Sequence, residues 1–192
     1  LGAGSFEVSW DRADLAKVRV RVGLARGLVG RTEQLASIAK RHRALAAING
    51  GFFDAYSDRP FKNVDQTVIS GGRFVHIGTI GSVIGFRPDG TAKIERARWS
   101  IDGALDGRWE GQNRWYAYWL NRTPTSSTTV TVFTPDWGSE TGHSGLQAVV
   151  DQGTVTWIGG GSMRIPKLGF VVLLAGDETR LRNRFEVGRP AE

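Results

Sequence analysis

The stretch "AAINGGFFDA", residues 46–55, joins a short apolar run to an amide, two glycines, two phenylalanines and an aspartate. The apolar run follows a helix-like segment, and it predicts a short buried strand over 44–48. Glycines directly after a strand allow a tight turn or a close approach of the backbone to a ligand. The stretch therefore predicts either a binding turn at the end of a strand or a tight turn anchored in the core by two aromatic side chains.

The polar groups of this turn are candidate binding groups. The Asn49 amide and the backbone N–H groups of Gly50 and Gly51 could bind sugar hydroxyls or phosphate oxygens. Two carboxylates lie within or just after the stretch, at Asp54 and Asp65. An aspartate in a turn commonly bonds to its own backbone, so a structural role stays open for both.

Upstream of the turn, the pattern indicates one helix. Thr32 can cap it, three apolar residues at positions 35, 38 and 39 form a stripe, and a basic run ends it, which together predict a helix over 32–42. Alternating valines within 6–26 predict a strand before that helix.

Downstream, short β-branched and aromatic runs alternate with turn signals. One helix among roughly ten strands predicts a β-rich α+β fold with mainly antiparallel sheets, in a single domain over 1–192. The further strands are expected at 67–69, 73–77, 82–87, 92–98, 115–120, 128–134, 146–150, 154–158 and 170–175.

Composition excludes several classes of protein. The 192 residues are 40% hydrophobic and 23% charged, which is ordinary for a globular chain, and there is no cysteine for a disulfide or a thiolate metal site. The longest apolar stretch, 169–176, is too short to span a membrane. Three isolated histidines, His42, His76 and His143, make no metal signature and are expected to be structural. We expect neither a metal nor a cofactor.

The net charge is +6, with 25 basic residues against 19 acidic ones. Such a surface could attract anionic ligands, or it could serve solubility alone. The net charge is the only feature of the sequence that favours nucleic-acid binding, because no basic patch is interleaved with aromatic residues. We therefore expect no nucleic-acid partner.

Residues 24–55, "LARGLVGRTEQLASIAKRHRALAAINGGFFDA", resemble the opening of the phosphodiester glycosidase family. This family includes the uncovering enzyme that removes N-acetylglucosamine from a phosphodiester-linked sugar. Five later segments resemble further motifs of the family in the right order, and the resemblance covers about residues 15–188. These segments are 68–72, 84–90, 120–122, 132–135 and 165–170.

The resemblance implies hydrolysis of a sugar–phosphate diester at the anomeric carbon of a glycan or envelope polymer. The alternative is a non-catalytic glycan-binding or cell-wall-binding module with the same fold. A glycan or envelope substrate implies a protein that is secreted or held in the cell envelope. Arg122 could bind a phosphate with two parallel hydrogen bonds, or it could form a surface salt bridge. The candidate catalytic residues are Asp54 and Asp65, and the candidate binding residues are Asn49, Gly50, Gly51 and Arg122.

The chain departs from the family near its end. The family carries an Arg-Thr-Ala-Ile/Val-Gly segment and an Asp-Gly-Gly-Gly-Ser segment, both expected at the active site, and neither occurs here. Residues 159–162 resemble the second segment, but they lack its aspartate and come too early, so they are expected to form a loop between strands. We therefore expect a domain that is incomplete at its C-terminus and that hydrolyses the diester poorly or not at all by itself. Its partners would be its own C-terminal segment or a second copy.

Overall fold

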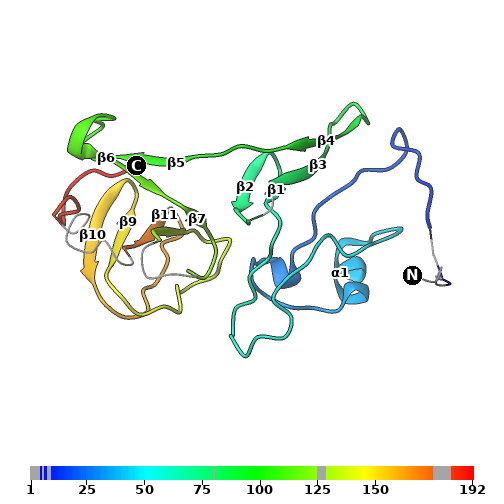
Figure 1. The fold of residues 1–192 in the computed structure, drawn as a ribbon, viewed down its shortest axis with the longest axis horizontal. Coiled ribbons are helices and arrows are strands. Elements are labelled where there is room, and N and C mark those ends of the chain that lie inside the picture. Colours follow the sequence, from blue (N-terminus) through cyan, green and yellow to red (C-terminus); the bar gives the residue numbers. More distant parts are fainter. Residues whose placement is uncertain (1–4, 6, 8–9, 80, 125–128, 175–182) are drawn as a thin grey trace.

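A computed structural model describes residues 5, 7, 10–79, 81–124, 129–174 and 183–192. The fold is β-rich α+β with mainly antiparallel sheets and one α-helix, as predicted. Figure 1 shows two parts, one with α1 and strands β1 to β4 and one with strands β5 to β11. No helix of the described segments has the length and apolar character needed to cross a membrane.

The elements follow one another along the chain as short pieces, most of them strands. They are η1 (Ala25–Gly27), α1 (Leu35–His42), β1 (Val68–Ser70), β2 (Arg73–His76), β3 (Ser82–Phe86), β4 (Ala92–Arg96), β5 (Ile101–Ala104), η2 (Gly111–Asn113), β6 (Arg114–Ala117), β7 (Trp119–Leu120), β8 (Thr131–Phe133), β9 (Gln147–Asp151), β10 (Thr154–Gly159) and β11 (Gly169–Leu173).

A five-stranded sheet forms the centre of the second part. Its strand order is β10-β9-β11-β8-β7, and every pair is antiparallel except β7 with β8. Strands β8 and β9 consist almost entirely of buried residues, and β11 buries its last three. Such continuous burial is expected of strands that are covered on both faces.

Alternate residues of this sheet enter two separate cores, because successive side chains of a strand point to opposite faces. On one face, strand residues pack with a cluster that includes Leu105, Trp115 and Phe185. On the other face, they pack with Val29 and Val75 from the first part of the chain. The strand residues of the first face are Val132, Ala148, Val150 and Val172, and those of the second are Phe133, Val149, Val171 and Leu173.

Three hairpins complete the fold: β1 with β2, β3 with β4, and β5 with β6. The turn of the first is formed by Gly71 and Gly72, whose φ angles of 60° and 76° suit the two-residue hairpin loop that the sequence predicts. The contact between the two parts includes the end of β2, where the N–H group of Ile77 donates to the Leu120 carbonyl at 3.2 Å.

Helix α1 begins later than the predicted residue 32. The residue before it is Gln34, and no side chain caps the helix. The Glu33 carboxylate instead accepts hydrogen bonds from the backbone N–H of Arg26 and from the Arg41 guanidinium, each at 2.6 Å. These bonds, with that to Arg26 the larger influence, lower the pKa of Glu33. The acidic residue thus ties the helix to the preceding chain.

Two predicted strands are wrong. The described residues of 6–26 form no strand, and Val20 and Val22 are exposed. Residues 44–48 form no strand either, and the side chains of Leu45 and Ile48 are 92% and 82% exposed. Both segments have strand composition, but no other described segment pairs with them, and a strand needs a partner for its backbone groups.

One interpretation of the sequence predicted that the two phenylalanines of the opening stretch anchor a turn in the core. This interpretation is wrong. Phe52 is 77% exposed, and Phe53 is also exposed. Phe53 instead forms an isolated antiparallel bridge with Val64. The chain therefore folds back on itself over 53–64, and this loop brings the two candidate aspartates near each other.

Candidate functional site

The candidate site lies where residues 63–66 run beside residues 121–123, an arrangement called here the junction. The Asp54 N–H donates to the Asn63 carbonyl at 2.9 Å, and the Asp65 N–H donates to the Phe52 carbonyl at 3.0 Å. Successive side chains of paired extended segments alternate between faces. Asp54 and Asp65 therefore leave this small pairing on the same face, opposite to Phe53.

Arg122 is the most deeply buried cation of the junction, with 5% of its surface exposed. Its Nη1 donates to the Val64 carbonyl at 3.0 Å, and its guanidinium lies 4.8 Å from the centre of the Trp119 ring. Its buried Nε has no hydrogen-bond partner. Burial lowers the pKa of Arg122 and Asp65 opposes this effect, but arginine stays charged in proteins. The side chain is a buried positive charge with an unused donor.

Asn121 holds Arg122 in place. It is fully buried and adopts a left-handed backbone conformation with φ of 51°, which asparagine tolerates better than most residues. Its Nδ2 donates to the Val75 carbonyl at 2.8 Å and to the Thr134 hydroxyl at 2.7 Å. Its Oδ1 accepts from the Thr134 N–H at 2.8 Å. The amide thus ties both strand β2 and the residue after β8 to the chain around Arg122.

Two further side chains join the segments directly. Asn63 Oδ1 accepts from the Thr123 N–H at 2.9 Å, and Asn63 Nδ2 donates to the Thr123 carbonyl at 3.4 Å. The His76 ring lies between the segments, with Nε2 2.8 Å from the Val64 carbonyl oxygen and Nδ1 2.8 Å from the Asn121 carbonyl oxygen. The junction is therefore held by side chains rather than by a sheet ladder.

Two glycines lie where a side chain would meet residues of the junction. A Cβ atom at Gly78 would lie 2.2 Å from the Asp65 carbonyl oxygen, and one at Gly51 would lie 2.2 Å from Gln66 Oε1. Such distances are too short for any side chain, although the Gln66 side chain could move whereas the Asp65 backbone could not. Gly78 thus fixes how closely β2 approaches Asp65.

The structure brings together some of the predicted site residues. Asp65 and Arg122 are electrostatic neighbours, since Asp65 acts on the pKa of Arg122, and Asp54 shares the face of Asp65. Gly51 lies against the Gln66 side chain, which belongs to the segment 63–66 that also contains Asp65. Asn49 and Gly50 are exposed and form no hydrogen bond with any described residue. A binding role for these two stays a prediction.

Sequence reasoning missed His76, Asn63 and Gly78. His76 was expected to be structural because it is isolated in the sequence. The available signal was its position between Val75 and Ile77, since a polar residue within an apolar run that becomes buried must find hydrogen-bond partners.

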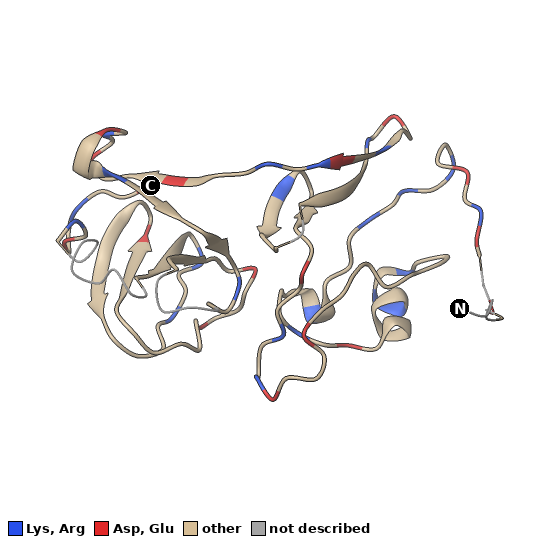
Figure 2. Cartoon of the chain, in the orientation of Figure 1, with Lys and Arg blue, Asp and Glu red and all other residues tan. Residues whose placement is uncertain are grey.

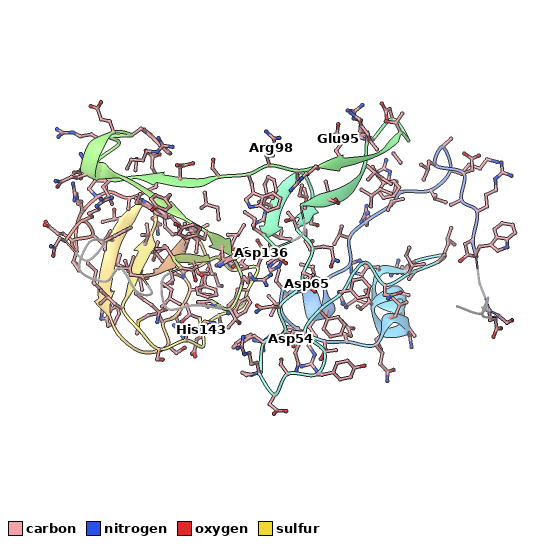
Figure 3. The ribbon with its side chains drawn as sticks, in the orientation of Figure 1. Asp54, Asp65, Glu95, Arg98, Asp136 and His143 are labelled. Atoms are coloured by element: carbon pink, nitrogen blue, oxygen red, sulfur yellow. The ribbon has the colours of Figure 1, made fainter. Side chains whose placement is uncertain are left out.

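Figure 3 shows Asp54, Asp65 and Asp136 near the middle of the molecule and His143 on the part with the five-stranded sheet. Figure 2 shows basic and acidic residues spread over both parts. No group of three His, Asp or Glu residues in the described segments could hold a metal ion.

Two cavities lie away from the junction. One, of about 510 Å³, is lined by residues 186–190 and Asp106, and the other, of about 420 Å³, is lined by residues 96–99, Thr79 and Gly81. Neither includes a predicted site residue. The candidate site is thus a buried charged junction beside an exposed turn.

Comparison with solved structures finds the same fold. A hypothetical protein from Synechocystis superposes with a TM-score of 0.74 at 22% identity, over 90% of this chain and 32% of that chain. A Burkholderia pseudomallei K96243 protein described as "Putative exported protein" gives a TM-score of 0.65 at 19% identity, over 86% of this chain and 40% of that chain. The chain thus spans less than half of either neighbour. No protein-family profile and no curated relative matches the sequence.

Proposed function

We propose that this chain carries part of the active site of a phosphodiester glycosidase, which hydrolyses a sugar–phosphate diester at the anomeric carbon. The observation that carries the proposal is Arg122, a buried guanidinium with an unused Nε beside the Asp65 carboxylate. A guanidinium is suited to bind phosphate oxygens, and a carboxylate is suited to general acid–base or nucleophilic work at a sugar.

The proposed roles follow from position. Arg122 binds the phosphate group, and Asp65 and Asp54 supply the two carboxylates that glycoside hydrolysis needs. The two carboxylates lie on the same face of the pairing. Neither forms an ion pair, since no basic nitrogen of the described residues lies within 4.0 Å of either one. The exposed turn with Asn49 and Gly50 would contact the sugar.

Weak turnover is expected of the chain by itself. The turn at 49–52 is exposed to water, and catalysis gains most when charged groups face the substrate in a site that excludes water. A site that is open on one side keeps part of its binding and loses most of its transition-state stabilisation.

A secreted or cell-envelope location is part of this proposal. A substrate in an envelope polymer would require it, and the description of the Burkholderia neighbour as an exported protein supports it. Its test is the cell fraction in which a tagged full-length protein is found.

The experiment is release of sugar from a chromogenic sugar–phosphate diester, measured with excess protein so that slow turnover is detectable. Asp65→Asn and Arg122→Lys should each lower the rate by about a hundredfold or more, because each removes a group that acts on the transition state. The matched control is Asp102→Asn, because the Asp102 carboxylate pairs with Arg114 on the distant β5–β6 hairpin. It should leave the rate unchanged.

The alternative function, a non-catalytic glycan-binding module, predicts a different outcome. Phosphorylated sugars would then bind and remain intact, even with excess protein. In both cases binding should weaken with salt, since Arg122 would attract the phosphate. Equal binding of neutral and phosphorylated sugars at low and high salt would contradict both functions.

A further inference from the structure

His76 contacts the two peptide groups that lead into the proposed site residues. It lies on strand β2 and is completely buried. The carbonyl oxygen 2.8 Å from its Nε2 belongs to Val64, directly before Asp65. The carbonyl oxygen 2.8 Å from its Nδ1 belongs to Asn121, directly before Arg122. One imidazole ring therefore bridges the backbone at both ends of the junction.

Both contacts can be hydrogen bonds only when the ring carries two protons. A backbone carbonyl oxygen only accepts, and a neutral imidazole has one N–H group and one nitrogen lone pair. In the neutral ring, one carbonyl would face that lone pair and its hydrogen bond would be lost. In the doubly protonated ring each nitrogen donates to one of the two carbonyls, so the two contacts of 2.8 Å suit the imidazolium best.

Two charged groups face the ring, Arg122 from the segment after β7 and Asp65 from the segment before β1. Burial lowers the pKa of His76, and Arg122 acts in the same direction, whereas the two carbonyls and Asp65 oppose them. The second proton therefore binds only under conditions more acidic than those in which an exposed histidine takes it up.

We propose that His76 is a positioning residue whose second proton closes a clamp on the peptide groups before Asp65 and Arg122. Closure fixes the separation of the carboxylate and the guanidinium, and opening releases one of the two segments. The importance of these two residues rests on the proposed function, whereas the clamp adds a dependence on acidity that the proposed function does not require.

Protonation of His76 should lower the free energy of unfolding, although it closes the clamp. A histidine whose pKa is lowered by folding stabilises the folded state above its unfolded pKa of about 6.5, and this contribution is lost as the pH falls. Acidification should thus lower the global stability while it closes the clamp. If acidification instead made the whole protein more rigid, global stability and clamp closure would increase together.

The first test is nuclear magnetic resonance of the labelled chain across a pH series. We expect both ring nitrogens of His76 to become protonated on acidification, and the amide signals of Asp65 and Arg122 to move with the same midpoint. A ring that titrates without moving these amides, or stays neutral until the protein unfolds, would overturn the proposal.

The second test is binding of a methyl phosphodiester of N-acetylglucosamine, whose single negative charge does not change over this pH range. Wild-type affinity should rise on acidification by about fivefold or more, the lower range of typical coupling between sites. His76→Asn, which keeps one donor, and His76→Phe, which keeps none, should both abolish this rise. The matched control is His42→Asn at the exposed end of α1, which should keep it.

The two tests separate the clamp from the proposed function. If neither the wild type nor any variant binds or cleaves the phosphodiester, the proposed function is wrong. The magnetic resonance series then still decides whether the clamp exists. If His76→Phe fails to fold, His76→Asn and the wild-type titration decide. A rise in affinity that persists in a folded His76 variant would refute the clamp.

Discussion

The five-stranded sheet and the β3–β4 hairpin both contain apolar residues on their strands, yet they differ in burial. Strand β8 buries every residue, β9 all but one and β11 its last three, because clusters of side chains cover both faces of the sheet. In the hairpin, every residue but one is exposed, including the cross-strand pair Ile84 and Ile94. A strand pattern in the sequence therefore does not say whether other segments will cover the strand.

The largest predicted difference between these regions is in stability. Phe133 is fully buried and stacks near Trp137 and His143, with ring centres 5.1 and 5.2 Å away. Phe133→Ala should lower the free energy of unfolding by about 3–5 kcal/mol, because it leaves a cavity among close-packed rings. Ile94, 74% exposed, is the control, and Ile94→Ala should cost at most about 0.5 kcal/mol. Urea unfolding measures both, and equal costs would contradict the comparison.

A smaller but still large effect is expected where strand β2 meets the chain that follows β7 and β8. Asn121→Ala removes every hydrogen bond of the buried amide and places alanine at a φ of 51°, so we expect a loss of about 2–3 kcal/mol. Asn121→Gly, which tolerates this backbone conformation, isolates the hydrogen-bond contribution. If the two variants are equally stable, backbone strain contributes nothing at this position.

Several elements of the fold were predictable from the sequence, because their residues carry the decisive physics locally. The β1–β2 hairpin follows from two glycines between apolar runs, and positions 71 and 72 have the positive φ angles that such a turn needs. Strands β9 and β11 follow from their apolar runs. Residues 159–162 end β10 and begin a loop, as expected. Strand β5 was not predicted, because its "IDGA" sequence contains an aspartate and a glycine, which are uncommon in strands.

The failed predictions involve partners that a local pattern cannot reveal. Residues 44–48 have strand composition, but none of the N–H groups from 45 to 51 pairs with another described backbone group. Asp54, Asp65 and Arg122, the candidates named from the sequence, lie in one region of the structure, and their roles stay predictions. The contacts of His76 could not be predicted, because they join it to residues 12 and 45 positions away in the sequence.

The third prediction concerns pH and the aromatic cluster that joins the loop at 54–63 to the sheet. Burial, followed by the charge of Arg59, lowers the pKa of His143, which stacks on Phe133. Stability from this group is therefore present above the unfolded histidine pKa of about 6.5 and is lost as the pH falls.

His143→Phe removes this titration and keeps the stacked ring. The drop in unfolding free energy between pH of about 7.5 and about 5 should be smaller than in the wild type. His42→Phe, at the exposed end of α1, should keep the wild-type drop. Denaturant titrations at both pH values measure the difference, and an unchanged drop in His143→Phe would contradict the assignment.

The smallest effect on stability is expected on the exposed face of the β3–β4 hairpin. Ile84 and Ile94 lie opposite each other and, with Phe86, present an apolar face to water. Threonine keeps the β-branched shape that suits a strand, so Ile84→Thr with Ile94→Thr should change the free energy of unfolding by no more than about 0.5 kcal/mol.

The same double variant should have a clear effect on self-association, because exposed apolar faces and unpaired strand edges favour contacts between chains. Sedimentation velocity over a concentration series would show less association in the variant than in the wild type. The control is Lys93→Thr, because Lys93 lies on the opposite face of the same hairpin and forms an ion pair there with Glu95. If the isoleucine variant instead unfolds like Phe133→Ala, the hairpin is covered in solution and the contrast with the central sheet does not hold. If both variants associate like the wild type, this face takes no part in contacts between copies.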